Sequence, residues 1–273
     1  NTMITDFAFS AIEAEGLGTD EFTDFLTVSY SSTDYVGHNF GLSSVELQDT
    51  YLRLDLEIER LLNYLDANVG EGNYTLFLTA DHGAAEVPTF LRDINVPGAN
   101  ISKDDFSPLF DAISAKYGVT DLIKSISNNQ LFLNQKLISS LQLTLEEVQR
   151  FVVNEIIKYP FVSNAYTAAT MQSSYFQDGL PMLLQMGYNQ KISGDVLFTL
   201  QPGVIVYGPK GTTHGSGYTY DTHVPLLFYG NGINQGKSYQ STKVTDIAPT
   251  ISALLGISFP SGTTGAVIEK VIY

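Results

Sequence analysis

The sequence contains no cysteine, and this absence restricts its chemistry in two ways. Without thiols, the 273-residue chain has no disulfide framework and offers no thiolate ligand to a metal. No apolar run approaches the roughly 18–20 residues that a membrane-spanning helix needs, so no membrane span is expected. The chain begins at Asn1 with no signal peptide ahead of it. We therefore expect a mature form or a fragment.

Basic residues are also scarce, because 14 Lys and Arg face 29 Asp and Glu and give a net charge of −15. Such a surface repels phosphate backbones, which argues against polymeric nucleic acid and anionic membranes as partners. One small phosphorylated substrate stays compatible with this charge, since bound divalent cations reverse the field locally. A hydrophobic content of 44% excludes a disordered chain.

Short apolar runs alternate with amphipathic helices, which predicts an α/β fold with a mostly parallel central sheet flanked by helices. The runs Phe25–Tyr30 and Tyr74–Leu78 are nearly continuous, as in buried strands. A long helix separates them, with a capping-box pattern at Ser43 and Glu46 and an apolar stripe from Leu47 to Leu65. Strand, helix and strand in this order predict a right-handed parallel crossover.

The remaining elements are less regular, particularly between residues 88 and 194. The patterns predict helices over residues 1–15, 106–116, 145–158 (capped by Thr144), 174–186 and 246–255, and strands over 130–133, 161–170, 195–200, 204–207 and 224–229. No Ser/Gly/Pro-rich linker isolates residues 88–194. We therefore expect one domain over residues 1–273, with 88–194 as an α+β insertion within it.

All four histidines lie in loops that follow strands or are rich in glycine, and three of them have an Asp within four residues. Asp34 and His38 follow the first predicted strand, and Asp81 and His82 follow the second. The carboxyl ends of strands are where functional groups gather in such sheets. The spacing D-x-x-x-H places both side chains on one face of a helical turn, or lets a tight loop bring them together.

Carboxylate and neutral imidazole are the ligand pair expected for zinc, with Mn²⁺ or Fe as competitors. Each histidine could instead be an ordinary hydrogen-bonded or surface residue. Their shared placement beside aspartates favours a metal site, and leaves the number of metals open.

Several strings together resemble the alkaline phosphatase superfamily, namely SSTDYVGHNFG, LTADHG, THGSGYTYDTHVPLLFYG and TDIAPTISALLGI. The sequence is most similar to the bacterial periplasmic phosphate-irrepressible alkaline phosphatases, over nearly its whole length and in the same order. The resemblance implies an alkaline-phosphatase-like fold and two zinc ions that bridge a phosphate. It also implies a Thr or Ser nucleophile that forms a phosphoenzyme, and a periplasmic or otherwise exported location.

By this resemblance, Asp34 and His38 match two ligands of one zinc, and Asp81 and His82 match two ligands of the other. The remaining ligand of the first zinc is a histidine of the third string. His214 is favoured, since relatives carry His-Gly at this place. His223 is the alternative for this ligand. If His223 does not bind the metal, we expect it, like Asp221, next to the ligands.

The resemblance also reveals a departure from the family pattern. Only 33 residues precede Asp34, and they contain no strand followed by a nucleophilic Thr. Thr5 and Thr19 lie in or beside a predicted helix and are poor candidates. The chain thus looks like the carboxyl-terminal part of a longer enzyme, whose amino-terminal part is missing. We expect about one complete zinc site, half of a second, and no nucleophile.

The implied function of the intact protein is zinc-dependent hydrolysis of phosphate monoesters, with little activity in this chain alone. Within the superfamily, a phosphodiesterase/nucleotide pyrophosphatase or a sulfatase is the alternative. A non-catalytic metal-binding domain is an alternative of another class. The sequence identifies neither substrate-binding residues nor an oligomeric state.

Overall fold

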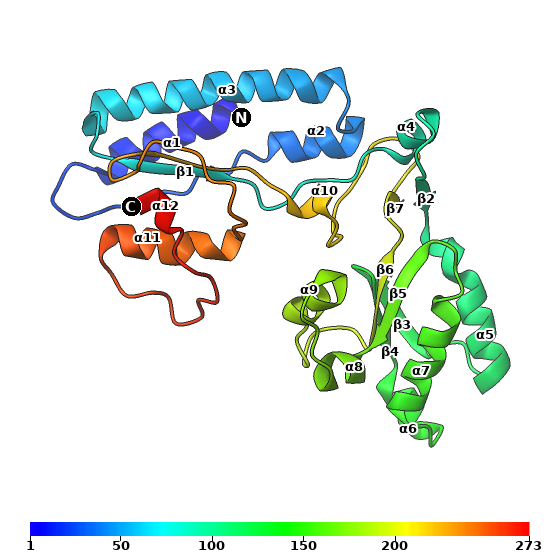
Figure 1. The fold of residues 1–273 in the computed structure, drawn as a ribbon. Coiled ribbons are helices and arrows are strands. Elements are labelled where there is room, and N and C mark those ends of the chain that lie inside the picture. Colours follow the sequence, from blue (N-terminus) through cyan, green and yellow to red (C-terminus); the bar gives the residue numbers. More distant parts are fainter. Residues whose placement is uncertain (273) are drawn as a thin grey trace. The chain divides into compact units, whose positions relative to one another are not determined.

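Both helices and strands form along residues 1–272, the part of the chain that a computed structural model describes (Figure 1). The elements fall into two units, each with its own internal contacts. Unit 1 comprises residues 1–33, 49–81 and those from 224 onward, and unit 2 comprises residues 34–48 and 82–223. None of the described helices is both long and apolar enough to cross a membrane.

Unit 1 is built from helices and one pair of strands. Its elements are α1 (Thr2–Glu15), most of α3 (Val45–Leu65), the π-helical turn η1 (Asp66–Gly70), β1 (Thr75–Thr79), β8 (Leu226–Gly230), the 3₁₀ turn η3 (Val244–Asp246), α11 (Ile247–Leu255) and α12 (Glu269–Ile272). Helices α1 and α3 pack together through stacked rings of Phe9 and Tyr64, with centroids 4.0 Å apart. Arg60 Nη2 donates to Asp6 Oδ1 at 2.7 Å and joins the same two helices.

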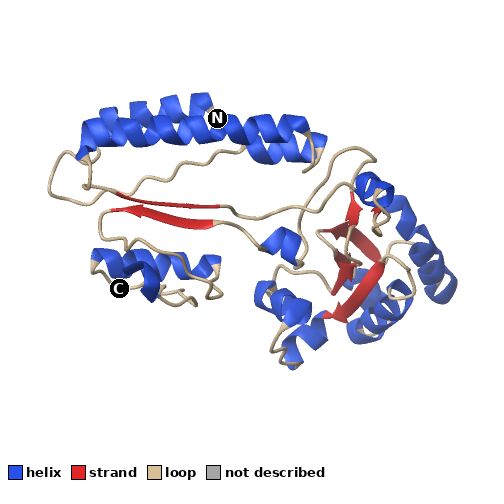
Figure 2. Ribbon diagram, turned by 45° about the horizontal axis from the view of Figure 1, so that its top comes forward, coloured by secondary structure: helices blue, strands red, loops and turns tan. Residues whose placement is uncertain are grey.

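The strands of unit 1 correct one prediction. β1 confirms the predicted strand, but it pairs antiparallel with β8, with Phe77 opposite Phe228 (Figure 2). Residues 23–30 form no strand and join no ladder among the described residues, so the predicted strand at Phe25–Tyr30 and the parallel crossover are wrong. A strand exists only where a neighbour completes its hydrogen bonds, which an apolar run cannot reveal by itself. The α/β class is confirmed, whereas the described strands include one parallel pair and no mostly parallel sheet.

Unit 2 contains the remaining elements. They are α2 (Ser32–Phe40, of which the first two residues belong to unit 1), α4 (Pro88–Asp93), β2 (Ala99–Ile101), η2 (Lys103–Phe106), α5 (Ser107–Tyr117), β3 (Ile123–Ser127), β4 (Gln130–Leu133), α6 (Gln135–Ser140), α7 (Leu145–Ile156), β5 (Val162–Thr167), α8 (Ala168–Ser173), α9 (Gly179–Gly187), β6 (Val196–Leu200), β7 (Val204–Val206) and α10 (Thr219–Thr222). Strands β3, β4, β6 and β5 form an antiparallel sheet in that order, and β2 pairs in parallel with β7.

The hydrophobic core of unit 2 lies between this sheet and helices α5 and α7. Leu109 and Ile113 on α5 and Val152 on α7 are completely buried, and they belong to one cluster with Val196 and Phe198 on β6. All five residues of β6 are buried, as expected for the continuous apolar run in its sequence. The core therefore fixes the scaffold from which β7 and the segment after it lead to the third histidine string.

Local signals fixed most helix ends correctly. Thr144 caps α7 as predicted, because its Oγ1 accepts a hydrogen bond from the Glu147 N–H at 3.2 Å. The capping prediction for α3 is displaced by one residue, since Ser44 and not Ser43 accepts from the Leu47 N–H. The predicted helix at 174–186 forms only in its second part, as α9. Residues 174–178 before α9 are not helical. That residues 88–194 are an insertion within one domain stays a prediction.

Candidate metal centre

Helix α2 carries Asp34 in its first turn and His38 in its last. Residues four apart lie on the same face of a helix, so the D-x-x-x-H spacing is satisfied by a regular helical turn. Asp34 Oδ1 lies 3.3 Å from His38 Nε2. A carboxylate in the first turn is also favoured by the partial positive charge of the helix amino terminus.

A backbone contact fixes the tautomer of His38. Its Nδ1 lies 2.8 Å from the carbonyl oxygen of Thr212. A carbonyl oxygen only accepts, so Nδ1 carries the proton and donates it in this hydrogen bond. In the neutral ring, Nε2 then presents its lone pair to Asp34 Oδ1. Two acceptors that face each other at this distance repel, unless a proton or a cation lies between them.

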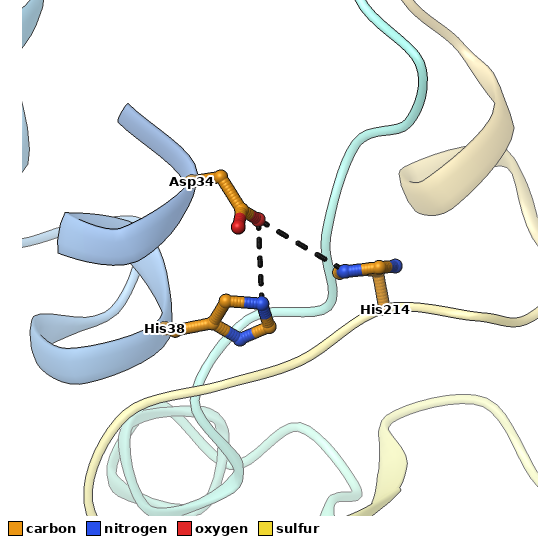
Figure 3. Close-up of side chains that lie close together, drawn as sticks. All are labelled: Asp34, His38 and His214. Atoms are coloured by element: carbon orange, nitrogen blue, oxygen red, sulfur yellow. Dashed lines mark ion pairs between the residues drawn. The ribbon is translucent and has the colours of Figure 1, made fainter. Parts of the chain in front are cut away.

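His214 brings a second imidazole to the same oxygen from a distant part of the chain. Its Nε2 lies 3.9 Å from Asp34 Oδ1. Figure 3 shows His214 reaching toward Asp34 from the segment that follows β7, while Asp34 and His38 both extend from α2. Each of the three residues offers a ligand atom, and these atoms lie within 4.8 Å of one another. The structure therefore groups Asp34, His38 and His214, and their role as metal ligands stays a prediction.

A third imidazole stands beside this group. His82 Nε2 lies 4.0 Å from Asp34 Oδ1, and its ring stacks on that of His214 with centroids 3.3 Å apart. Burial and the neighbouring rings of His82 and His38 lower the pKa of His214 below its usual range. His214 is therefore held neutral near pH 7, the form in which a histidine can bind a metal.

The distances within the group suit a small metal ion. Zinc binds nitrogen and oxygen at about 2.0–2.2 Å in a tetrahedron, which places neighbouring ligand atoms about 3.3–3.6 Å apart. The separations of 3.3 and 3.9 Å from Asp34 Oδ1 to the two histidines are close to this value. One carboxylate and neutral imidazoles are also the donor set that zinc prefers. The residues present therefore fit a divalent transition metal.

Asp221 connects the segments that carry His214 and His82 through hydrogen bonds. Its side chain is 4% exposed, and Oδ2 accepts hydrogen bonds from the Gly215 N–H at 3.1 Å and from both the N–H and the hydroxyl of Ser216 at 2.7 Å. Its backbone carbonyl accepts from the Gly83 N–H at 2.7 Å. Asp221 thus joins the residues next to His214 with the residue next to His82.

Thr212 is the residue that sequence reasoning missed. Its carbonyl accepts from His38 Nδ1, its N–H donates to the His38 carbonyl at 3.1 Å, and its buried hydroxyl donates to the Ala85 carbonyl at 2.5 Å. The adjoining Gly211 has φ +79°, and a Cβ there would collide with the His38 carbonyl. The only sequence signal was the G-T-T-H string itself, which names no partner.

Two other predicted residues lie outside the group. His223 directly follows α10 and has an exposed side chain, and the described group does not include it. Asp81 is the last residue of its segment in unit 1, while its neighbour His82 begins a segment of unit 2. The structure thus brings His214, rather than His223, to Asp34 and His38.

The chain matches, over residues 2–224, the family described as type I phosphodiesterase / nucleotide pyrophosphatase. It is 41% identical to alkaline phosphatase PafA of Elizabethkingia meningoseptica, over all of this chain and 50% of that protein. It is 43% identical to a protein named calcium-transporting ATPase of Myroides odoratus, over all of this chain and 50% of that protein. It is 41% identical to alkaline phosphatase PhoV of Synechococcus elongatus, over all of this chain and 49% of that protein.

Solved structures agree with these similarities. The crystal structure of wild-type alkaline phosphatase PafA superposes with a TM-score of 0.94 at 41% identity, over all of this chain and 52% of that one. Murine ectonucleotide pyrophosphatase/phosphodiesterase 5 superposes with a TM-score of 0.64 at 14% identity, over 94% of this chain and 61% of that one, and shares the fold. The chain spans about half the length of the curated relatives named above.

Proposed function

Because the chain belongs to the type I phosphodiesterase/nucleotide pyrophosphatase family of the alkaline phosphatase superfamily, we propose that it carries the metal centre of a phosphomonoester hydrolase. One observation carries this proposal. The Nε2 atoms of His38, His82 and His214 all lie within 4.0 Å of Asp34 Oδ1. Imidazoles gathered around one carboxylate oxygen serve as metal ligands more readily than as structural hydrogen-bonding groups, since an imidazole nitrogen that carries no proton and a carboxylate oxygen are both acceptors.

In this proposal Asp34, His38 and His214 hold one zinc, and Asp81 and His82 provide ligands to a second. Bound zinc neutralises charge on the transferring phosphoryl group and stabilises the leaving oxygen. The residues of this chain orient the ligands. The Thr212 carbonyl accepts a hydrogen bond from His38 Nδ1 and so aims the Nε2 of His38 at the proposed metal position.

We further propose that the nucleophile lies outside these 273 residues and that the chain alone turns over little substrate. The two candidate threonines support this reading. Thr5 is completely buried, and its Oγ1 lies 3.1 Å from the Tyr30 hydroxyl. Thr19 Oγ1 donates to the Gly16 carbonyl at 2.6 Å. Both hydroxyls are therefore engaged in hydrogen bonds within unit 1. By its resemblance to periplasmic phosphatases, we place the protein outside the cytoplasm.

Zinc titration by calorimetry, followed by anomalous scattering at the zinc edge, tests the metal centre. We expect about one zinc per chain, with Asp34, His38 and His214 at about 2.0–2.2 Å. His214→Ala should lower zinc affinity by at least about 100-fold, because it removes a ligand. His223→Ala is the matched control and should change affinity less than about 2-fold, since exposed substitutions away from a site have small effects. Equal losses in both variants would refute the assignment.

The description of the family favours a second candidate, hydrolysis of phosphodiesters or nucleotide pyrophosphates. Comparing turnover of a phosphate monoester, a phosphate diester and a sulfate ester by a full-length protein separates the candidates. The 273-residue chain, assayed with p-nitrophenyl phosphate and zinc, should give little product. Strong turnover that a chelator abolishes would show that the chain contains its own nucleophile.

A further inference from the structure

Glu86 joins two of the segments that carry the proposed metal ligands. It lies four residues after His82, in a stretch without helix or strand that leads to α4. Its Oε2 accepts a hydrogen bond from the Ser43 hydroxyl at 2.7 Å, and its Oε1 accepts one from the Val87 N–H at 2.8 Å. Ser43 lies five residues after His38, between α2 and α3. The carboxylate of Glu86 therefore connects the loop after α2 with the segment after His82, within unit 2.

A close backbone approach supports the same connection. Gly41, between α2 and Ser43, is buried and has φ +89°. A Cβ at this position would collide with Cγ2 of Val87 and would lie 3.9 Å from Glu86 Oε1. Glycine therefore lets the two segments come closer than a residue with a side chain would allow. The turn at the end of α2 and the residues around Glu86 thus pack directly against each other.

Three segments with proposed ligands form a closed set of contacts: α2, residues 83–87 and the third histidine string. The first contact joins α2 to the third histidine string, since His38 Nδ1 lies 2.8 Å from the Thr212 carbonyl. The second joins that string to residues 83–87, since the Thr212 hydroxyl donates to the Ala85 carbonyl at 2.5 Å. Glu86 supplies the third contact, from residues 83–87 back to the loop after α2. Two contacts would leave three segments that can bend at their joints, whereas the third contact closes the set and fixes their relative positions.

We propose that Glu86 is a positioning residue of the metal centre, because it holds the segment of His82 against α2 through Ser43. This inference rests on the metal centre of the proposed function. Glu86 is not part of the group of ligand atoms around Asp34, so it acts through the segments and not on the metal. A hydrogen bond to an ionised carboxylate is roughly twice as strong as one between neutral groups, which suits a contact between loops. Residues that support metal ligands in this way typically change metal affinity by about 10- to 100-fold when they are replaced.

Hydrogen exchange of the metal-free chain tests the contact by itself. The Gly83 N–H donates to the Asp221 carbonyl at 2.7 Å, and the Ala85 N–H donates to the Thr213 carbonyl at 3.2 Å. Glu86→Ala should make these two amides exchange at least about 10-fold faster, because they exchange by local opening of a segment that the carboxylate holds in place. The β6 amides of the same variant should keep their wild-type rates, which shows that the core of unit 2 stays folded. Neither metal nor activity enters this measurement.

Zinc titration by calorimetry then tests the positioning role. Glu86→Ala and Ser43→Ala should each lower zinc affinity by about 10-fold, and the double variant should lose no more than either, since both act through one contact. Ser43→Thr keeps the hydroxyl and should bind zinc within about 2-fold of the wild type. The visible absorption of bound Co²⁺ depends on ligand geometry, so it should change in the two alanine variants but not in Ser43→Thr. Glu147→Ala, at an exposed glutamate of α7, is the matched control and should bind zinc like the wild type.

The possible failures are distinguishable. A wild-type chain that binds no zinc would refute the metal centre of the proposed function, and the role of Glu86 with it. Zinc affinity of both alanine variants within about 2-fold of a wild type that does bind zinc would overturn the role of Glu86 alone. An equal loss in Glu147→Ala, or unchanged exchange of the Gly83 and Ala85 amides in Glu86→Ala, would also overturn it. Ser43→Ala removes one hydroxyl from an exposed residue, so it decides the question if Glu86→Ala loses the protection of β6.

Discussion

Replacing Asp221 by Asn should weaken zinc binding, although Asp221 is not itself in the group of ligand atoms. Its Oδ2 accepts three hydrogen bonds, two from N–H groups and one from the Ser216 hydroxyl. Hydrogen bonds to a charged acceptor contribute about 1.5–3 kcal/mol, and those to a neutral acceptor about 0.5–1.5 kcal/mol. Asn keeps one neutral oxygen for these donors, so about 1 kcal/mol is lost for each bond that survives.

The other half of the side chain adds to this loss. Asp221 Oδ1 is buried and has no hydrogen-bond partner among residues 1–272. An Asn amide group must bury donors at this place or turn them toward the Gly215 and Ser216 N–H groups, and unpaired buried donors cost about 1–3 kcal/mol. The sum is about 4–6 kcal/mol, acting on the loop that carries His214. If half of it falls on the metal-bound state, zinc affinity drops about 30- to 150-fold.

Calorimetric zinc titration of the wild type and Asp221→Asn measures the effect. Asp178→Asn serves as the control, because Asp178 is exposed and makes no side-chain cap hydrogen bond at the start of α9. Ser216→Ala removes one of the three donors and should show a smaller loss. Zinc affinity of Asp221→Asn within about 2-fold of the wild type would refute the reasoning, since the loop would then hold His214 without its carboxylate anchor.

Two further predictions concern pH and stability. Burial and the facing histidines lower the pKa of His214 in the fold, so the unfolded chain binds its proton more readily. The metal-free chain should therefore lose stability as pH falls through about 6.5, and His214→Gln should reduce this loss in melting curves recorded from pH 8 to pH 5. Leu109→Ala empties part of the unit 2 core and should destabilise it by about 2–5 kcal/mol, measured by hydrogen exchange of the β6 amides. Leu52→Ala, at a side chain that is 63% exposed, is the control and should have almost no effect.

The sequence predicted what local physics determines. The cap at Thr144, the long helix of Val45–Leu65 and the shared face of Asp34 and His38 depend on residues within one or two helical turns. The grouping of His214 with Asp34 spans a far longer separation. It was found by resemblance and not by periodicity. The role of Thr212, which binds His38 through its backbone, could not be predicted, because a carbonyl group carries no residue-specific signal.

Strand pairing was the main failure, for a related reason. An apolar run predicts burial, but not which neighbour provides it. Residues 25–30 and β1 have similar compositions, yet among residues 1–272 only β1 has a strand partner, β8, which follows it by about 150 residues. The expected burial on both faces is also not observed, since residues 25–27 are exposed and four of the five residues in β1 are half-buried.

The contacts described above that orient the proposed metal ligands lie within unit 2. Thr212 orients His38, and Asp221 anchors the residues beside His214 and His82. Phe25 is an exposed residue of unit 1 and takes part in none of these contacts. Phe25→Asp should therefore leave zinc affinity within about 2-fold of the wild type, since exposed substitutions outside such contacts have small effects.

Calorimetric zinc titration of one variant in each unit separates their contributions. Asp221→Asn in unit 2 should weaken zinc binding, and Phe25→Asp in unit 1 should not. A loss of zinc affinity in Phe25→Asp as large as that in Asp221→Asn would show that the metal centre depends on unit 1. The ligand-orienting contacts of unit 2 would then be insufficient to form the site, and the assignment of its rigidity to Thr212 and Asp221 would fail.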